Sequence, residues 1–469
     1  MKKFFTILAL SAALVATSCN KWLDINTNPN YVGEADMAML MPTIQLMTAD
    51  KVGYELSLYG SFWAQYVVQN ANTNQYYTIM TNDVTNSTFT SPWTYFYASV
   101  LPRIREVVAK AEEKGNASNY TLEAKAMLAY SLYLLTSLYG DVAYTEGYLK
   151  ETQTPKFDSA QEMQGIIIAL CEEIRAMDAA KAAADEVQNV SVSSDMVFGG
   201  DTDAWFQFVN TLYLKVLLRD FTANKTKIQN LLAEDNFLAQ DAAFDNFANE
   251  ANKSNPFYES DRRQLNTDAN IRCCSDVLNV LSATDPRLKY YYDENPGGVV
   301  MGAPYGQTVK PESSSRLALY PTEAVYFSTV DEALFLQAEA YARLNNAVAA
   351  AAAYDAAVKA AFVRVGCKAA DATALLATSY LFVPGTVESM VEQVINQKWA
   401  SNVHGLPWES WFDLNRTGYP TRGTTITNES GVLAAGNYPR RFIYSKTSAD
   451  YNPNSPAPLA VDEKMWWHK

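Results

Sequence analysis

Apolar residues recur at every third or fourth position along most of the chain, which is the pattern of helices that each bury one face. Two of these helices carry start signals, because Ser159 and Glu162 form a capping box and Asp203 is placed as an N-cap. Gly140 is expected to end an earlier helix. The pattern predicts helices at 36–47, 54–68, 93–111, 122–139, 159–177, 203–216, 228–232, 330–344, 347–362 and 387–399.

Two of the predicted helices form a close pair. The helices at 330–344 and 347–362 are joined through Asn345 and Asn346, and together they span about the 34 residues of a tetratricopeptide unit. Small side chains such as Ala340 allow the two helices to approach closely. The remaining repeats are diverged and interrupted, so spacing alone does not assign them.

Three stretches break the helical rhythm. Residues 69–91 mix Asn and Thr with aromatic residues, and these polar side chains compete with helix formation by bonding to their own backbone. Residues 293–322 are rich in glycine, and residues 416–469 are rich in Pro, Tyr, Asn and Gly. We expect long irregular excursions on a helical frame, and binding sites are often found on such loops.

The start of the chain has the layout of a bacterial lipoprotein signal. Two lysines are followed by an apolar run at 4–15 and by small residues at 16–18, directly before Cys19. We therefore expect residues 1–18 to be a signal peptide. The thiol of Cys19 would carry the lipid, and its acyl chains would hold the mature protein on a membrane.

Residues 19–35 are then a tether, and residues 36–469 form a single domain. A plain secretory signal and a transmembrane anchor are the alternatives, since Ala16 stands where lipoprotein signals usually have Leu. No later run approaches the roughly 20 apolar residues that a membrane helix needs. The rest of the chain is therefore expected to be soluble and outside the cytoplasm.

Composition narrows the function further. The chain has 469 residues, of which 48% are hydrophobic, and this is enough for a large packed core. Its formal net charge of -14 disfavours nucleic acid as a partner and leaves membrane attachment to the lipid. The later cysteines have no zinc-like spacing and are expected to be buried free thiols: Cys171, Cys273, Cys274 and Cys367.

Catalytic groups are few. His404 and His468 are the two histidines, and they form no metal-binding or triad spacing. No phosphate-binding loop is present either. We therefore expect a protein that is not an enzyme and that needs no metal or cofactor.

Capture of a saccharide needs aromatic faces for the sugar ring and polar side chains for its hydroxyls. Two places combine these residue types away from the helical stripes, and the alternative is that their rings pack beneath their own loops. The candidate ligand-binding residues are Tyr76 and Tyr77 with Asn72, Asn74 and Gln75, and then Tyr291, Tyr292 and Tyr305 beside the glycine-rich stretch.

Other conspicuous residues have structural interpretations. A charge pair beside a large ring, at Trp411, Asp413 and Arg416, could suggest an active site. We expect instead that Arg416 and Asp413 form a structural arginine–carboxylate pair after a helix. Asp203, next to Asp201, is explained by helix capping rather than by calcium binding. Core positions are predicted for Trp93, Trp205 and Trp399.

Several short motifs also lie in order along the whole chain. They are CNKWLDINTNPN from Cys19, Leu138-Tyr139-Gly140-Asp141-Val142 with Tyr144-Thr145-Glu146, Gly199-Gly200-Asp201 before Trp205, Asp285-Pro286-Arg287-Leu288, Ala338-Glu339-Ala340, Gln397-Lys398-Trp399, the run from Trp411 to Pro420, and Met465-Trp466-Trp467. Together they resemble the SusD/RagB family of outer-membrane nutrient-binding lipoproteins. The chain departs from the family at Ala143, where Pro is common, and at Asn415, where a second Arg is common.

The resemblance implies a mostly α fold, a SusD-like superhelix of tetratricopeptide-like helical pairs with long loop excursions. It implies a lipid-anchored protein on the outer membrane that faces the cell surface, binds a glycan and delivers it to a SusC-like TonB-dependent transporter. A peptide-binding subunit of the RagB type, a surface hydrolase and a scaffold that binds only protein are the alternatives. Only Asp24 stands where many family members have an acidic export signal after the cysteine.

Overall fold

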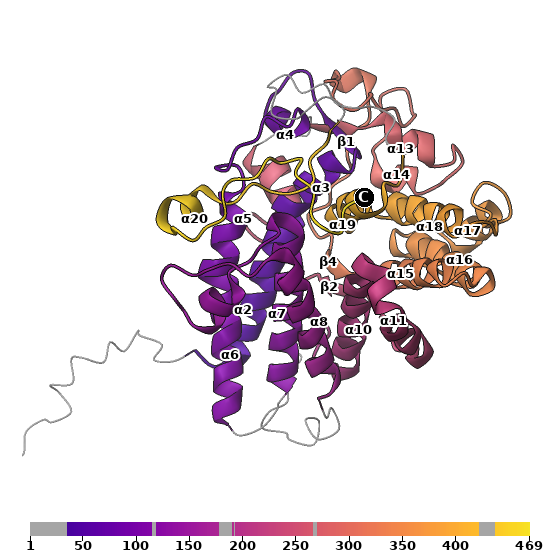
Figure 1. Ribbon diagram of the computed structural model, residues 1–469. Coiled ribbons are helices and arrows are strands. Elements are labelled where there is room, and N and C mark those ends of the chain that lie inside the picture. The colour runs from indigo at the N-terminus through magenta and orange to yellow at the C-terminus, as the bar shows by residue number, and fades with distance from the viewer. Residues whose placement is uncertain (1–34, 115–118, 178–189, 192, 266–269, 422–436) are drawn as a thin grey trace, which may run out of the picture.

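The computed structural model describes residues 35–114, 119–177, 190–191, 193–265, 270–421 and 437–469. The predicted signal peptide, Cys19 and nearly all of the predicted tether lie outside these residues. The described chain is mostly helical (Figure 1), which confirms the predicted fold class. None of the helices in these ranges is both long and apolar enough to cross a membrane.

Helices account for most of the described residues. The long and medium ones are α2 (Met37–Lys51), α3 (Ser57–Trp63), α5 (Thr90–Tyr95), α6 (Leu101–Glu113), α7 (Asn119–Tyr139), α8 (Ala160–Arg175), α10 (Thr202–Leu217), α11 (Phe221–Glu234), α15 (Val330–Arg343), α16 (Ala347–Arg364), α17 (Ala369–Leu376), α18 (Val387–Ser401), α19 (Pro407–Thr417) and α20 (Lys446–Tyr451). Single-turn helices include α4 (Tyr77–Met80), α12 (Pro256–Tyr258), α13 (Ser275–Val280) and α14 (Leu288–Tyr291).

The predicted helix signals are mostly confirmed. The capping box of Ser159 and Glu162 is formed, and α7 ends at Gly140, whose φ of 87° is left-handed. The N-cap predicted at Asp203 is wrong, because α10 begins one residue earlier and the Asp201 carboxylate accepts hydrogen bonds from the amides of Asp203 and Ala204.

The predicted helix at 54–68 also ends too late. The chain leaves α3 after Trp63, since Gln65 adopts a φ of 65°, and then enters the strand β1 (Val67–Gln69). This early exit turns the chain toward the irregular segments instead of continuing the bundle.

Two small antiparallel sheets connect segments that are far apart in sequence. β1 pairs with β3 (Ile271–Cys273), and β2 (Ala242–Phe244) pairs with β4 (Val325–Ser328). Isolated bridges join Asn70 to Val309, Cys274 to Ala303 and Tyr292 to Leu317. The predicted loop at 69–91 and the glycine-rich stretch therefore lie together at one end of the molecule, where Figure 1 shows α4, β1, α13 and α14.

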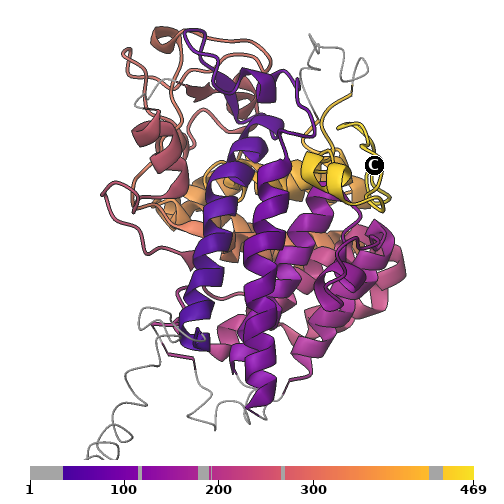
Figure 2. The same ribbon diagram turned by 90° about the vertical axis from the view of Figure 1, so that its left-hand side faces the viewer.

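Helix pairing gives the molecule two halves. Helices α6, α7, α8 and α10 pack in sequence, and in the second half α15 packs against both α16 and α18. Figure 2 shows the long helices of the first half standing side by side, with the orange helices of the second half crossing behind them. The predicted pair at 330–362 is thus present as α15 and α16.

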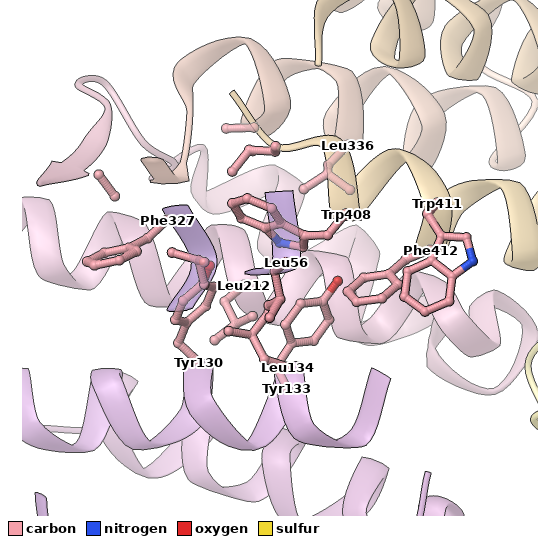
Figure 3. Close-up of a cluster of buried hydrophobic side chains, with 14 of the residues drawn as sticks. Leu56, Tyr130, Tyr133, Leu134, Leu212, Phe327, Leu336, Trp408, Trp411 and Phe412 are labelled. Carbon is pink, nitrogen blue, oxygen red and sulfur yellow. The ribbon is translucent and has the colours of Figure 1, made fainter. Parts of the chain in front are cut away.

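The two halves meet in an aromatic core. Tyr130 and Tyr133 on α7 point toward Phe327 of β4 and Trp408 of α19 (Figure 3), and the rings of Tyr130 and Phe327 are 5.5 Å apart. Gly60 allows the backbones of α3 and α19 to come into contact. A Cβ atom at this position would lie 2.3 Å from the backbone nitrogen of Trp408. Trp93, Trp205 and Trp399 are buried, as predicted.

A chain of buried ion pairs crosses this core. The ammonium of Lys215 on α10 lies 2.8 Å from Glu332 of α15 and 3.0 Å from Glu409 of α19. The ammonium of Lys398 on α18 lies 3.4 Å from Glu332 and 2.9 Å from Asp413. Only α18 and α19 are consecutive along the chain, so most of these ion pairs join helices that are far apart in sequence.

The chain of ion pairs continues through Arg416. Its guanidinium pairs with Asp413 at 2.7 Å and donates to Glu339 of α15 at 2.7 Å, and Arg343 donates to the same Glu339 at 2.7 Å. The predicted arginine–carboxylate pair at Asp413 and Arg416 is therefore present, with Glu339 as an additional partner that the sequence did not reveal.

The guanidinium groups decide the ionisation of Glu339. Burial alone would raise the pKa of this carboxyl, but Arg416 and Arg343 outweigh it and hold the pKa well below the usual range. The pKa of Asp413 is also lowered, because Lys398 and Arg416 together outweigh its burial.

We expect Glu339→Ala to destabilise the protein by about 3 kcal/mol, because the buried guanidinium of Arg416 would lose one of its two carboxylate partners and Arg343 would lose its partner as well. Chemical unfolding followed by circular dichroism measures this change. Glu388→Ala is the control, because Glu388 pairs with Lys469 at the surface, where both side chains are more than half exposed. Its cost is expected to stay below about 1 kcal/mol. Equal costs for the two variants would contradict a structural role for the buried ion pairs.

The free energy of unfolding should also depend on pH, because Glu339 is ionised in the folded protein. Its lowered pKa contributes stability that is fully present above the unfolded-state pKa of about 4.3 and is lost as the pH falls toward the lower folded-state pKa. Unfolding free energies measured from pH 6 to pH 2 should therefore fall steeply for the natural chain. The slope should be shallower in Glu339→Gln, which cannot ionise, and identical slopes would refute this assignment.

Candidate functional site

The predicted aromatic candidates are mostly buried. Tyr76 lies under its own loop and donates a hydrogen bond from its hydroxyl to Asp261 at 3.0 Å. Tyr291 and Tyr292 are fully buried, and Tyr305 is nearly so. The prediction that these four rings present a face to a ligand is wrong, because protein atoms already cover them.

The rest of the predicted site lies at the surface. Asn72, Asn74 and Gln75 are exposed, and Tyr77 is half-buried at the start of α4. The loop that carries them is held from below by Gln69, whose side chain donates to the Thr73 hydroxyl at 2.6 Å and accepts from the Tyr76 amide at 2.8 Å. These polar side chains are therefore displayed on a supported loop.

A cavity of about 260 Å³ lies elsewhere, between α14, the segment before β4, the end of α16 and the chain after α18. This volume is close to the lower end, about 300 Å³, of the range for small-molecule sites. Its lining is rich in tyrosine and holds three ionisable side chains of other types. The lining residues are Tyr290, Tyr320, Thr322, Glu323, Ala324, Tyr326, Arg364, Val365 and His404.

Two tyrosine rings of this cleft are open to solvent. Tyr290 is 41% exposed and Tyr320 is 47% exposed, and both line the same cavity. The hydroxyl of Tyr290 donates to the carbonyl of Gly366 at 3.3 Å. Gly366 has a φ of 87°, and a Cβ atom there would lie 3.3 Å from the Tyr290 ring. A glycine at this position therefore lets the ring lie against the chain after α16.

The segment that carries Tyr320 is held by Asn255. The backbone N–H of Asn255 donates to the Pro321 carbonyl at 2.7 Å, and its side-chain amide donates to the Glu323 carbonyl at 2.9 Å. The turn closes on itself through the Glu323 amide, which donates to the Tyr320 carbonyl at 3.3 Å. Both sides of the cleft are thus anchored by backbone hydrogen bonds.

The floor of the cleft contains a histidine fixed by a carboxylate. His404 Nδ1 lies 2.7 Å from Glu323 Oε1, and the imidazole stacks on the buried Tyr291 ring at 5.8 Å. Because a carboxylate accepts this bond, the hydrogen sits on Nδ1. Tyr291, predicted as a ligand contact, instead supports a residue that lines the cavity.

The hydroxyls of Tyr320 and Tyr326 stay protonated at neutral pH. Burial, followed by the Asp293 and Glu323 carboxylates, raises the pKa of Tyr320 above its ordinary value. Burial also raises the pKa of Tyr326, although Arg364 acts in the opposite direction from above its ring. Aromatic faces and hydroxyl donors are therefore combined in one cleft, which is the chemistry that a sugar requires.

The cysteines of the described chain are as the sequence predicts. The four later cysteines are free and buried, as predicted. No group of three His, Cys, Asp or Glu side chains within the described ranges is arranged to hold a metal ion.

Sequence reasoning missed Tyr290 and Tyr320. Residues 290–292 are three consecutive tyrosines, and a single-turn helix offers no periodicity from which to tell the outward ring from the inward ones. Tyr320 lies in the predicted glycine-rich excursion, but its exposure depends on contacts with Asn255 that are distant in sequence. The one available signal was that tyrosine is common in this excursion and its flanks.

Comparisons with known proteins agree with this fold. The pattern of the SusD-like family, described as starch-binding and associating with the outer membrane, matches residues 29–445. A SusD homologue from Bacteroides uniformis is 19% identical with a TM-score of 0.77, and the match covers 92% of this chain and 99% of that one. No match was found among the curated proteins.

Two further solved structures are similar over nearly their whole lengths. A chitin-binding SusD homologue from Flavobacterium johnsoniae is 19% identical with a TM-score of 0.74, over 92% of this chain and 97% of that one. A SusD/RagB family protein from Bacteroides thetaiotaomicron is 21% identical with a TM-score of 0.71, over 92% and 99% of the two chains. The family is described by binding, so the protein is a binding protein rather than an enzyme. The chain belongs to the SusD-like family, whose members are described as starch-binding and associating with the outer membrane.

Proposed function

We propose that this protein is a capture subunit that binds an oligosaccharide or polysaccharide in the cleft between Tyr290 and Tyr320. The observation that carries the proposal is the pair of exposed tyrosine rings beside a cavity of about 260 Å³. Such rings cover the apolar face of a sugar, and the protonated hydroxyls of Tyr320 and Tyr326 donate to its oxygens.

The supported loop after β1 is a second contact in this proposal. Asn72, Asn74, Gln75 and Tyr77 offer amide groups and one half-buried ring at the end of the molecule where the irregular segments meet. A polysaccharide is long enough to reach beyond one cleft, so this loop would contact units of the chain outside it.

Cys19 would attach the protein to the outer membrane through its lipid, facing the cell surface, and the bound glycan would pass to a TonB-dependent transporter of the SusC type. The family description supports the membrane and the glycan. Affinity is expected to be modest, because an open cleft leaves many ligand hydroxyls in contact with water. A permanent anchor beside the transporter offsets modest affinity by keeping the local concentration high.

We expect Tyr290→Ala and Tyr320→Ala each to weaken glycan binding about tenfold, since an aromatic face contributes about 0.5–1.5 kcal/mol beyond its buried area. Titration calorimetry of the described domain against fragments of starch, chitin and cellulose, with a peptide pool alongside, measures this. Tyr451→Ala is the control, because this ring is 79% exposed on α20 and lies outside the lining of the cleft. Binding of peptides alone would point to a peptide receptor, and release of cleaved sugars would point to a hydrolase.

The loop should matter for long ligands only. Asn74→Ala combined with Tyr77→Ala is expected to weaken binding of a polysaccharide several-fold and to leave binding of a di- or trisaccharide unchanged. Affinity electrophoresis in polysaccharide gels, compared with calorimetry on the short sugars, separates the two effects. If both ligand lengths respond equally, the loop belongs to the primary site, and if neither responds, it makes no contact.

A further inference from the structure

Glu323 is the charged side chain that the cleft presents to a ligand. Its side chain is 24% exposed, and Oε1 is occupied by the hydrogen on His404 Nδ1. The second carboxylate oxygen, Oε2, takes no part in this hydrogen bond, and the Glu323 side chain lines the cavity. A ligand in the cleft would therefore lie close to a full negative charge in a partly desolvated place, where Coulomb interactions are stronger than in water.

Arg364 also lines the cavity, but its positive charge does not neutralise Glu323. Arg364 is 4% exposed and forms a two-point pair with Asp331, with nitrogen–oxygen distances of 2.8 and 3.1 Å. Its Nη2 also donates to the Ser401 carbonyl at 2.7 Å, and its Nη1 donates to the His404 carbonyl. The guanidinium is neutralised and held in place, so it is not available to a ligand carboxylate or sulfate.

A second carboxylate acts on the same cleft. Asp293 is close enough to raise the pKa of Tyr320, and it is paired with Arg316 at the surface. Both the Asp293 and the Glu323 carboxylates therefore act on the exposed Tyr320. A glycan that carries its own negative charge would meet repulsion from Glu323 and would find its nearest arginines already paired.

His404 holds the Glu323 carboxylate in its place in the cleft. Its side chain is 8% exposed, and it lines the same cavity as Glu323. The hydrogen bond between His404 Nδ1 and Glu323 Oε1, at 2.7 Å, therefore fixes the position of the charge that a ligand would meet.

We propose that Glu323 is the specificity-determining residue of the cleft, which admits neutral or amino-bearing sugars and rejects glycans carrying carboxylates or sulfates. This inference rests on the proposed glycan-binding function. The charge of Glu323 excludes anionic units, and the tyrosine rings accept the apolar face of an uncharged ring.

The test uses a neutral oligosaccharide that binds among the starch, chitin and cellulose fragments, the same sugar oxidised to a uronate at C6, and the methyl ester of that uronate. Ester and uronate have nearly the same shape and differ in charge. At low salt we expect the natural protein to bind the ester at least about tenfold more tightly than the uronate, and we expect salt to narrow the gap.

Glu323→Gln keeps an acceptor for His404 Nδ1 and removes the charge. In this variant the uronate should bind within about threefold of the ester, with affinity for the neutral sugar little changed. Glu113→Gln removes the same charge from the exposed end of α6 and should leave the tenfold gap intact.

Equal binding of ester and uronate by the natural protein, or a gap that persists in Glu323→Gln, would overturn the inference while leaving glycan binding in place. Failure of every sugar in the panel to bind would overturn the proposed function and the inference together. Thermal unfolding of each variant shows whether it is folded before its affinity is compared.

Discussion

The fold depends on charge balance inside its core. Lys215, Lys398 and Arg416 come from three different helices, and each lies within ion-pair distance of carboxylates on α15 or α19. Taking such charges out of water is costly unless every partner is present, so the helices assemble in one arrangement or leave charges buried alone. The apolar stripes provide most of the driving force, and the ion pairs select which helices meet.

The same constraint positions the candidate site. The first turn of α15 carries Asp331 and Glu332 side by side, directly after β4. Glu332 points to the lysines of the core, whereas Asp331 holds Arg364, which in turn holds the backbone of His404. One helical turn thereby links the core to the cleft. The binding surface is shaped by a rigid frame beneath it, although the exposed tyrosines themselves lie on a single-turn helix and a loop.

The sequence allowed the helical frame to be predicted because a buried stripe repeats every three or four residues and because caps such as Ser159 are local. Errors arose where the outcome depended on distant contacts. Asp201 and Asp203 are separated by one residue, and the pattern placed the N-cap at Asp203 rather than at Asp201. Consecutive tyrosines concealed that Tyr290 is the outward ring. The partners of Asp413 and Arg416 include Glu339, about 75 residues away, and no local pattern marks such a pairing. The sequence therefore indicated that tyrosines near the glycine-rich stretch were candidates for the site. It did not indicate that the exposed rings would be Tyr290 and Tyr320.

Glycan binding between Tyr290 and Tyr320 can be tested with a crystal structure of residues 35–469 and a bound oligosaccharide. One sugar ring is expected to lie against the exposed face of at least one of these tyrosines, with a ligand hydroxyl within hydrogen-bond distance of Glu323. An oligosaccharide bound elsewhere, with this cleft empty, would show that the cleft is not the binding site.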